Sequence, residues 1–167
     1  MRRLAPPGII ATLAGSWRLT RTVDNGASMT GIAAFGDRGD GHFNYREQGR
    51  LRLPGGGFID AERRYVFTDE DGGFAVWFAE NPPRLFHRVV LARAGSRLVG
   101  QARHLCGEDR YDSRYEFVAD DAFRVEHAVR DPRKRYAMSS GYALLMPDAD
   151  DAAPKRLTEN EVGRINQ

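Results

Sequence analysis

Histidine and cysteine are the side chains of this sequence that most readily bind metals or transfer protons. His104 and Cys106 stand two residues apart in RHLCGEDRY, so on a strand they face the same way. With His87 from the preceding strand they could bind zinc. One inward histidine could ligate haem, and Cys106 beside His104 could act as a nucleophile. A lone His-x-Cys is no recognised metal-ligand spacing, and a free cysteine is usually inert, so we predict no metal site. No motif identifies a cofactor.

Tyrosine, glutamate and arginine side chains could instead perform acid–base chemistry on a bound ligand. Tyr45 and Glu47 lie in FNYREQGRLRL, and Arg63 lies in the next predicted strand. Together with a histidine they could bind a carboxylate-bearing compound and move a proton. The alternative is structural, because a buried carboxylate needs a partner, and Arg21 or Arg63 could supply it for Glu47.

The elements that must position these side chains are strands. Hydrophobic residues alternate with polar ones, and turn residues recur about every 8–12 positions, which is typical of all-β proteins. Ten strands are predicted, over residues 14–23, 29–36, 42–53, 57–68, 73–80, 84–92, 96–106, 110–118, 121–130 and 134–146. A short helix is predicted before them in PPGIIATLAG. Ten consecutive strands with short connections favour a single up-and-down antiparallel barrel over an open sandwich, because closure removes exposed edges.

The same alternation sorts residues between the two faces of each strand. Arginines mark the outer faces, and three of the four histidines share the apolar inner face. On strand 84–92 this places Leu85 and His87 inside. The predicted ligand-binding residues are the polar members of the inner faces: Tyr45, Glu47, Arg63, His87, His104, Tyr115, His127 and Tyr142. An apolar barrel with a few such groups is typical of a small-molecule pocket, and a filled core is the alternative.

The barrel domain is predicted to span residues 1–146. Residues 147–167 are predicted to form a polar tail, in which Thr158 and Glu161 could begin a short helix as a capping box. The formal charge of +2 gives no case for nucleic acid or a membrane as partner. A single cysteine excludes an intrachain disulfide, and we expect a cytoplasmic protein. Nothing in the sequence fixes the oligomeric state.

The stretch LAGSWRLTR resembles the opening of the calycin (lipocalin-like) barrels, in which a short helix precedes a Gly-x-Trp at the start of the first strand. The resemblance implies that Trp17 packs at the base of the barrel beneath an arginine from near the last strand. Arg133, in DPRKRY, is the candidate for that arginine.

Residues 12–146 are more closely similar to an uncharacterised bacterial family of such barrels, a domain of unknown function. The similarity rests on LAGSWRLTR, YREQGRLRL, RLFH, RHLCGEDRYDSRYEF and PRKRYAMSSGY. The family has glycine before Pro-Arg-Lys and an acid after it, where this chain has Asp131 and Arg135. The resemblance implies the fold and brings no known activity.

Three functions are compatible with these features. The first is binding of a small, partly apolar ligand, which can be anionic, inside the barrel. The second is a cofactor-free lyase or isomerase that uses the tyrosines, Glu47, histidines and Arg63 of the same pocket. The third is a filled barrel that acts as an interaction module.

Overall fold

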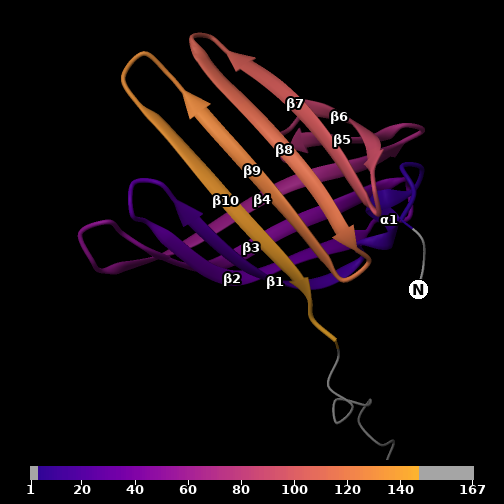
Figure 1. Cartoon of the computed structure of the whole chain (residues 1–167), viewed down its shortest axis with the longest axis horizontal. Coiled ribbons are helices and arrows are strands. Elements are labelled where there is room, and N and C mark those ends of the chain that lie inside the picture. The colour runs from indigo at the N-terminus through magenta and orange to yellow at the C-terminus, as the bar shows by residue number, and fades with distance from the viewer. Residues whose placement is uncertain (1–3, 147–167) are drawn as a thin grey trace, which may run out of the picture.

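The computed structural model describes residues 4–146 and shows a closed barrel of ten antiparallel strands (Figure 1). A short helix, α1 (Ile9–Thr12), precedes the strands. The strands are β1 (Gly15–Val23), β2 (Ser28–Asp37), β3 (His42–Arg52), β4 (Phe58–Glu70), β5 (Gly73–Phe78), β6 (Arg84–Ala94), β7 (Arg97–Cys106), β8 (Asp109–Ala119), β9 (Ala122–Arg130) and β10 (Arg135–Leu144). Each strand pairs with the next, and β10 pairs with β1. The predicted up-and-down barrel is confirmed.

The strands form where hydrophobic and polar residues alternate. In β1, Trp17, Leu19 and Arg21 are buried while the residues between them are exposed. β3 repeats the pattern with Phe43, Tyr45 and Glu47. All ten predicted strands form, and their ends differ from the predicted ends by at most two residues.

Helix α1 closes one end of the barrel. Its side chains Ile9 and Ile10 are fully buried, and the Asp69 carboxylate on β4 accepts hydrogen bonds from the backbone N–H groups of Ile10 (2.8 Å) and Ala11 (3.1 Å). This carboxylate satisfies helix N–H groups that would otherwise lack partners. In Figure 1, α1 lies at the right, and the β1–β2, β3–β4, β7–β8 and β9–β10 turns lie at the opposite, open end.

Trp17 sits at the closed end, but Arg133 does not cover it. The Trp17 indole N–H donates to the Leu13 carbonyl (2.8 Å), and its ring meets Phe123 edge to face at 4.9 Å. Arg133 is an exposed residue of the β9–β10 turn, at the opposite end of the barrel. The predicted Trp17–Arg133 closure is therefore wrong, because α1 and Phe123 seal the tryptophan instead.

Strand β6 departs from simple alternation in a way that changes the interior. The pairing of β5 with β6 shifts register between Val76 and Trp77, and both Phe86 and His87 are buried. An extra residue of this kind moves its neighbours to the other face. Leu85, predicted to point inward with His87, is therefore only partly buried, and Phe86 occupies the interior.

No helix among residues 4–146 is both long and apolar enough to cross a membrane. The predicted tail at 147–167, with Thr158 and Glu161, lies outside the described residues.

Candidate functional site

A buried ion pair links β1 to β3 inside the barrel. Two nitrogens of the Arg21 guanidinium, Nη1 and Nη2, donate to the two oxygens of Glu47 at 2.8 and 3.0 Å, and Nε donates to Ser140 Oγ at 2.7 Å. The Tyr45 hydroxyl donates to Glu47 at 2.6 Å and lies 3.0 Å from the Tyr142 hydroxyl. Because two parallel hydrogen bonds join the Arg21 guanidinium to the Glu47 carboxylate, the relative orientation of the two groups is fixed.

The protonation states of this network follow from its contacts. Burial acts to raise the pKa of Glu47, but hydrogen bonds and charge attraction from Arg21 outweigh it, and the pKa falls below its usual value. The same pairing outweighs burial at Arg21 and raises its pKa. Burial raises the pKa of Tyr142 to about 12 and that of Tyr45 well above 10. At neutral pH the network therefore holds one cation, one anion and two neutral phenols.

Two histidines on the inner faces are held neutral. His87 Nε2 lies 2.8 Å from the Tyr115 hydroxyl, and burial, with smaller contributions from His127 and His104, lowers the pKa of His87 to about 3. His127 Nδ1 lies 2.6 Å from Ser113 Oγ. Burial, followed by the nearby Arg21 and Arg63 charges, lowers the pKa of His127 to about 4.

His104 lies nearer the open end. Its ring lies 5.2 Å from the ring of Phe86 and 5.9 Å from that of Phe78, centroid to centroid. Its Nε2 atom is buried and has no hydrogen-bond partner among the described residues. Such an atom is costly to leave unsatisfied, so a ligand or water that bonded to it would lower the free energy of the site.

The open end of the barrel contains a mouth pocket of about 290 Å³. Its walls are mostly aromatic and apolar: Tyr65, Phe78, Phe86, Tyr111, Tyr136 and Met138. Its polar residues are Arg63, Arg84, His104, Cys106 and His127. Beneath it, packed around the Arg21–Glu47 pair, lies a smaller cavity of about 40 Å³, with room for only a few waters. Both hollows share Arg63, Tyr65, Phe86 and His127.

The two arginines of the mouth differ in their contacts. Arg84 lies over the Phe78 ring at 4.5 Å and donates to Glu80 at 3.1 Å. Arg63 has one weak ionic contact, 4.0 Å from its Nε to Glu47, and no hydrogen bond to any described residue. Because Arg21 already neutralises Glu47, Arg63 has no close carboxylate partner, and its side chain is 47% exposed to solvent at the mouth.

All eight predicted ligand-binding residues come from the inner side of the barrel, and their role in binding stays a prediction. Six of them line the interior cavity: Tyr45, Glu47, Arg63, Tyr115, His127 and Tyr142. His104 lines the mouth with Arg63 and His127, whereas His87 lines neither hollow.

Several residues of the site are additional to that prediction. Tyr111 and Tyr136 share strand parity with Tyr115 and Tyr142, so alternation alone could have identified them. For Arg21 the sequence indicates only a role as partner of Glu47, and the structure confirms that pairing. Phe86 could not be found this way, because the register shift in β6 brings it inside.

The possible zinc ligands do not form a cluster. Cys106 is exposed, and His87 is hydrogen-bonded to Tyr115. Within residues 4–146, no group of three or more His, Cys, Asp or Glu side chains is placed to hold a metal ion.

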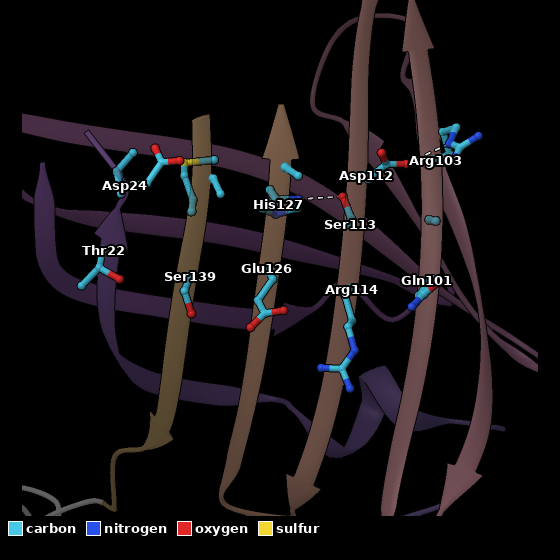
Figure 2. Close-up of a pocket in the computed structure, with 15 residues that line it drawn as sticks. Thr22, Asp24, Gln101, Arg103, Asp112, Ser113, Arg114, Glu126, His127 and Ser139 are labelled. Atoms are coloured by element: carbon cyan, nitrogen blue, oxygen red, sulfur yellow. Dashed lines mark hydrogen bonds and ion pairs between the residues drawn. The ribbon is translucent and has the colours of Figure 1, made fainter. Parts of the chain in front are cut away.

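A larger hollow of about 810 Å³ lies on the outside of the barrel, across β7 to β10 and the end of β1 (Figure 2). Figure 2 shows Gln101, Arg114 and Glu126 on neighbouring strands of this outer groove, and the Arg103–Asp112 ion pair (2.8 Å) at one side. Its charges are of both signs and largely solvated, which weakens their hold on a small ligand. We therefore take the mouth pocket, with the buried network beneath it, as the candidate site.

Comparison with known proteins agrees with the barrel fold. The S-type phycobiliprotein lyase CPES from Guillardia theta is similar in structure, with a TM-score of 0.57 and 10% identity over 83% of this chain and 91% of that one. A de novo designed fluorescence-activating β-barrel gives a TM-score of 0.44 and 13% identity, over 85% of this chain and 100% of the design. The structure of EF1p2_mFAP2b bound to DFHBI gives a TM-score of 0.42 and 12% identity, over 81% of this chain and 95% of that one.

No curated protein matches the chain. A family model, described as a family of unknown function (DUF6314), matches residues 13–144. These residues span all ten barrel strands, from β1 to the end of β10. The predicted membership of a family of barrels of unknown function is thereby confirmed: the chain belongs to the DUF6314 family.

Proposed function

We propose that the protein binds a small, partly apolar and anionic ligand in the mouth pocket of its barrel. The observation that carries this proposal is the combination, in one hollow, of aromatic walls and Arg63, which has no close carboxylate partner. Binding pockets are typically apolar with a few placed polar groups, and at about 290 Å³ the mouth is at the small end of their size range of about 300–1,000 Å³.

Deep burial of a ligand is not part of the proposal. The interior below the mouth is filled by side chains, the Arg21–Glu47 pair among them. A ligand therefore occupies the mouth, with its polar end toward Arg63 and His127, where the two hollows meet.

The lyase or isomerase alternative would need a general base. Glu47 is a poor one, because Arg21 and Tyr45 hold it as a hydrogen-bonded anion with a lowered pKa. An enzyme at this site would instead have to use His104 or His127, which line the mouth.

The outer groove favours the interaction-module alternative, since its 810 Å³ hollow could receive part of another macromolecule. Two neighbouring residues of β10 separate the alternatives. Met138 lies on the inner-face side of β10 and lines the mouth, although it also borders the outer groove, whereas Ser139 lines the outer groove alone. Tryptophan at position 138 would fill the mouth, whereas tryptophan at position 139 would fill the groove.

Native mass spectrometry of the freshly purified full chain tests the proposal against its denatured mass. We expect an organic mass excess in the wild type and in Ser139→Trp, and its loss in Met138→Trp. Circular dichroism checks that both variants fold. A bare protein mass in the wild type would contradict retention of a ligand, and an excess lost only from Ser139→Trp would place binding in the groove.

A further inference from the structure

The charge distribution of the barrel interior calls for an anion. Arg21 and Glu47 neutralise each other and Arg84 pairs with Glu80, so the remaining charge at the mouth is that of Arg63, whose side chain is 47% exposed. None of the described residues that line the mouth is acidic. A ligand with one negative charge would pair with this guanidinium through charge-assisted hydrogen bonds.

The donors at the junction of the two hollows match a carboxylate. Arg63 presents a planar guanidinium, whose paired N–H groups suit the two oxygens of a carboxylate. Beside it, Ser113 Oγ can donate to His127 Nδ1, which leaves His127 Nε2 as the protonated nitrogen, available to a ligand. A point cation such as lysine would provide no such two-oxygen geometry.

The aromatic walls around these donors match a flat ring. Tyr65 and Phe86 face the mouth with nearly parallel rings, 15° apart and 6.1 Å between centroids. Tyr111 meets Phe86 edge to face at 5.9 Å. Aromatic side chains in such arrangements hold another planar ring by offset stacking and edge contacts, whereas a flexible aliphatic chain gains only from burial.

From these observations, and resting on the proposed function, we infer that the ligand is a planar aromatic monocarboxylate. Its carboxylate is bound by Arg63 and His127, and its ring lies among Tyr65, Phe86 and Tyr111, all of which line the mouth.

Three probes separate the parts of this inference in calorimetric titrations of the full chain. 2-Naphthoate has both ring and acid, 2-naphthamide keeps the ring without the charge, and octanoate keeps the acid on a flexible chain. A charge-assisted hydrogen bond contributes about 1.5–3 kcal/mol, so we expect naphthoate to bind at least about tenfold more tightly than naphthamide. Octanoate should also bind more weakly than naphthoate.

Arg63→Gln should reduce the affinity for naphthoate to that for naphthamide and leave the latter unchanged. Arg64→Gln is the matched control, because Arg64 is the next residue, points outward and pairs with Glu62 at 2.7 Å. Arg63→Lys should recover only part of the lost affinity. Thermal unfolding monitored by circular dichroism checks that each variant folds.

The outcomes distinguish this inference from the proposed function. Equal affinity for naphthoate and naphthamide, or no effect of Arg63→Gln, would overturn the role of the acid while a ligand site remained. Equal affinity for octanoate and naphthoate would overturn the aromatic class. Absence of binding by all three probes would overturn the inference together with the proposed function.

Discussion

The Arg21–Glu47 pair determines the properties of the barrel interior at the scale of single residues. Both side chains are buried, and the pair holds Tyr45 and Ser140 in the same network. A pair of this kind contributes less to net stability than its short distances suggest, because both charges lose hydration. The main effect of the pair is on side-chain positions. It fixes the side chains beneath the mouth and leaves Arg63 without a close carboxylate partner.

Breaking the pair from one side should be costly. Glu47→Gln keeps the shape but leaves the Arg21 charge buried without a counter-ion, which should lower the free energy of unfolding by about 3–5 kcal/mol. Glu62→Gln is the control, because it removes an exposed carboxylate that bridges Arg46 and Arg64 and should cost no more than about 1 kcal/mol. Urea denaturation followed by circular dichroism measures both, and equal losses would contradict this account.

The neutral histidines make stability depend on pH. His87 and His127 have folded-state pKa values of about 3 and about 4, below the ordinary 6.5, so the unfolded chain binds protons more readily than the folded one. Their contribution to stability is complete above pH 6.5 and is lost as pH falls toward 4. Each histidine adds a slope of up to about 1.4 kcal/mol per pH unit in that window.

Denaturation measured across the window between pH 6.5 and 4 tests this slope. Replacing His87 or His127 by glutamine should reduce it, and His42→Gln, at an exposed position, should not. A slope unchanged in the His87 and His127 variants would show that other groups cause the acid sensitivity.

At the scale of elements, two glycines allow β2 and β3 to approach closely. Gly31 and Gly49 face each other across the pair, and a Cβ on Gly31 would meet the Gln48 carbonyl oxygen and lie 2.8 Å from the Cα of Gly49. Neither atom can move without shifting backbone. The pair therefore fixes the course of β2 and β3, and with it the position of Glu47.

Alanine at position 31 should consequently destabilise the barrel by about 1–3 kcal/mol, as overpacking does. Gly36→Ala in the same strand is the control, because the nearest atom to its added Cβ is 4.0 Å away, and alanine there should be neutral or slightly stabilising. Thermal unfolding measures both variants, and a loss of stability at position 36 equal to that at position 31 would contradict the close approach.

The elements also show what sequence patterns can predict. The period-two pattern and the turn residues predicted every strand, because burial on one face governs local sequence. Alternation could not predict the β6 register shift that brings Phe86 inside, since the shift depends on pairing with β5. Nor could it decide whether Arg21 or Arg63 pairs with Glu47, because alternation places all three on inner faces of nearby strands and leaves the choice to side-chain geometry. The resemblance to calycin barrels led to the wrong prediction that Arg133 covers Trp17, since Arg133 lies at the opposite end of the barrel.

At the scale of the whole molecule, the two ends of the barrel differ. α1 and Trp17 fill one end, and the cavity above them holds only a few waters, so the open end is the part of the interior that can accept a ligand. The outer groove is the second large hollow, on the other face of the same strands. A test of the account must therefore report from a named place in the mouth.

The methionines provide such reporters, in a full chain labelled with ¹³C at the methionine methyl groups. Met138 lines the mouth and also borders the outer groove, Met29 is buried beside Arg21, and Met146 is exposed beyond β10. During titration with 2-naphthoate, we expect the Met138 methyl resonance to shift and saturate, in the wild type and in Ser139→Trp alike, while the Met146 resonance stays in place. If the Met138 resonance does not move at high probe concentration, or if it moves no more than that of Met146, the mouth pocket is not the ligand site.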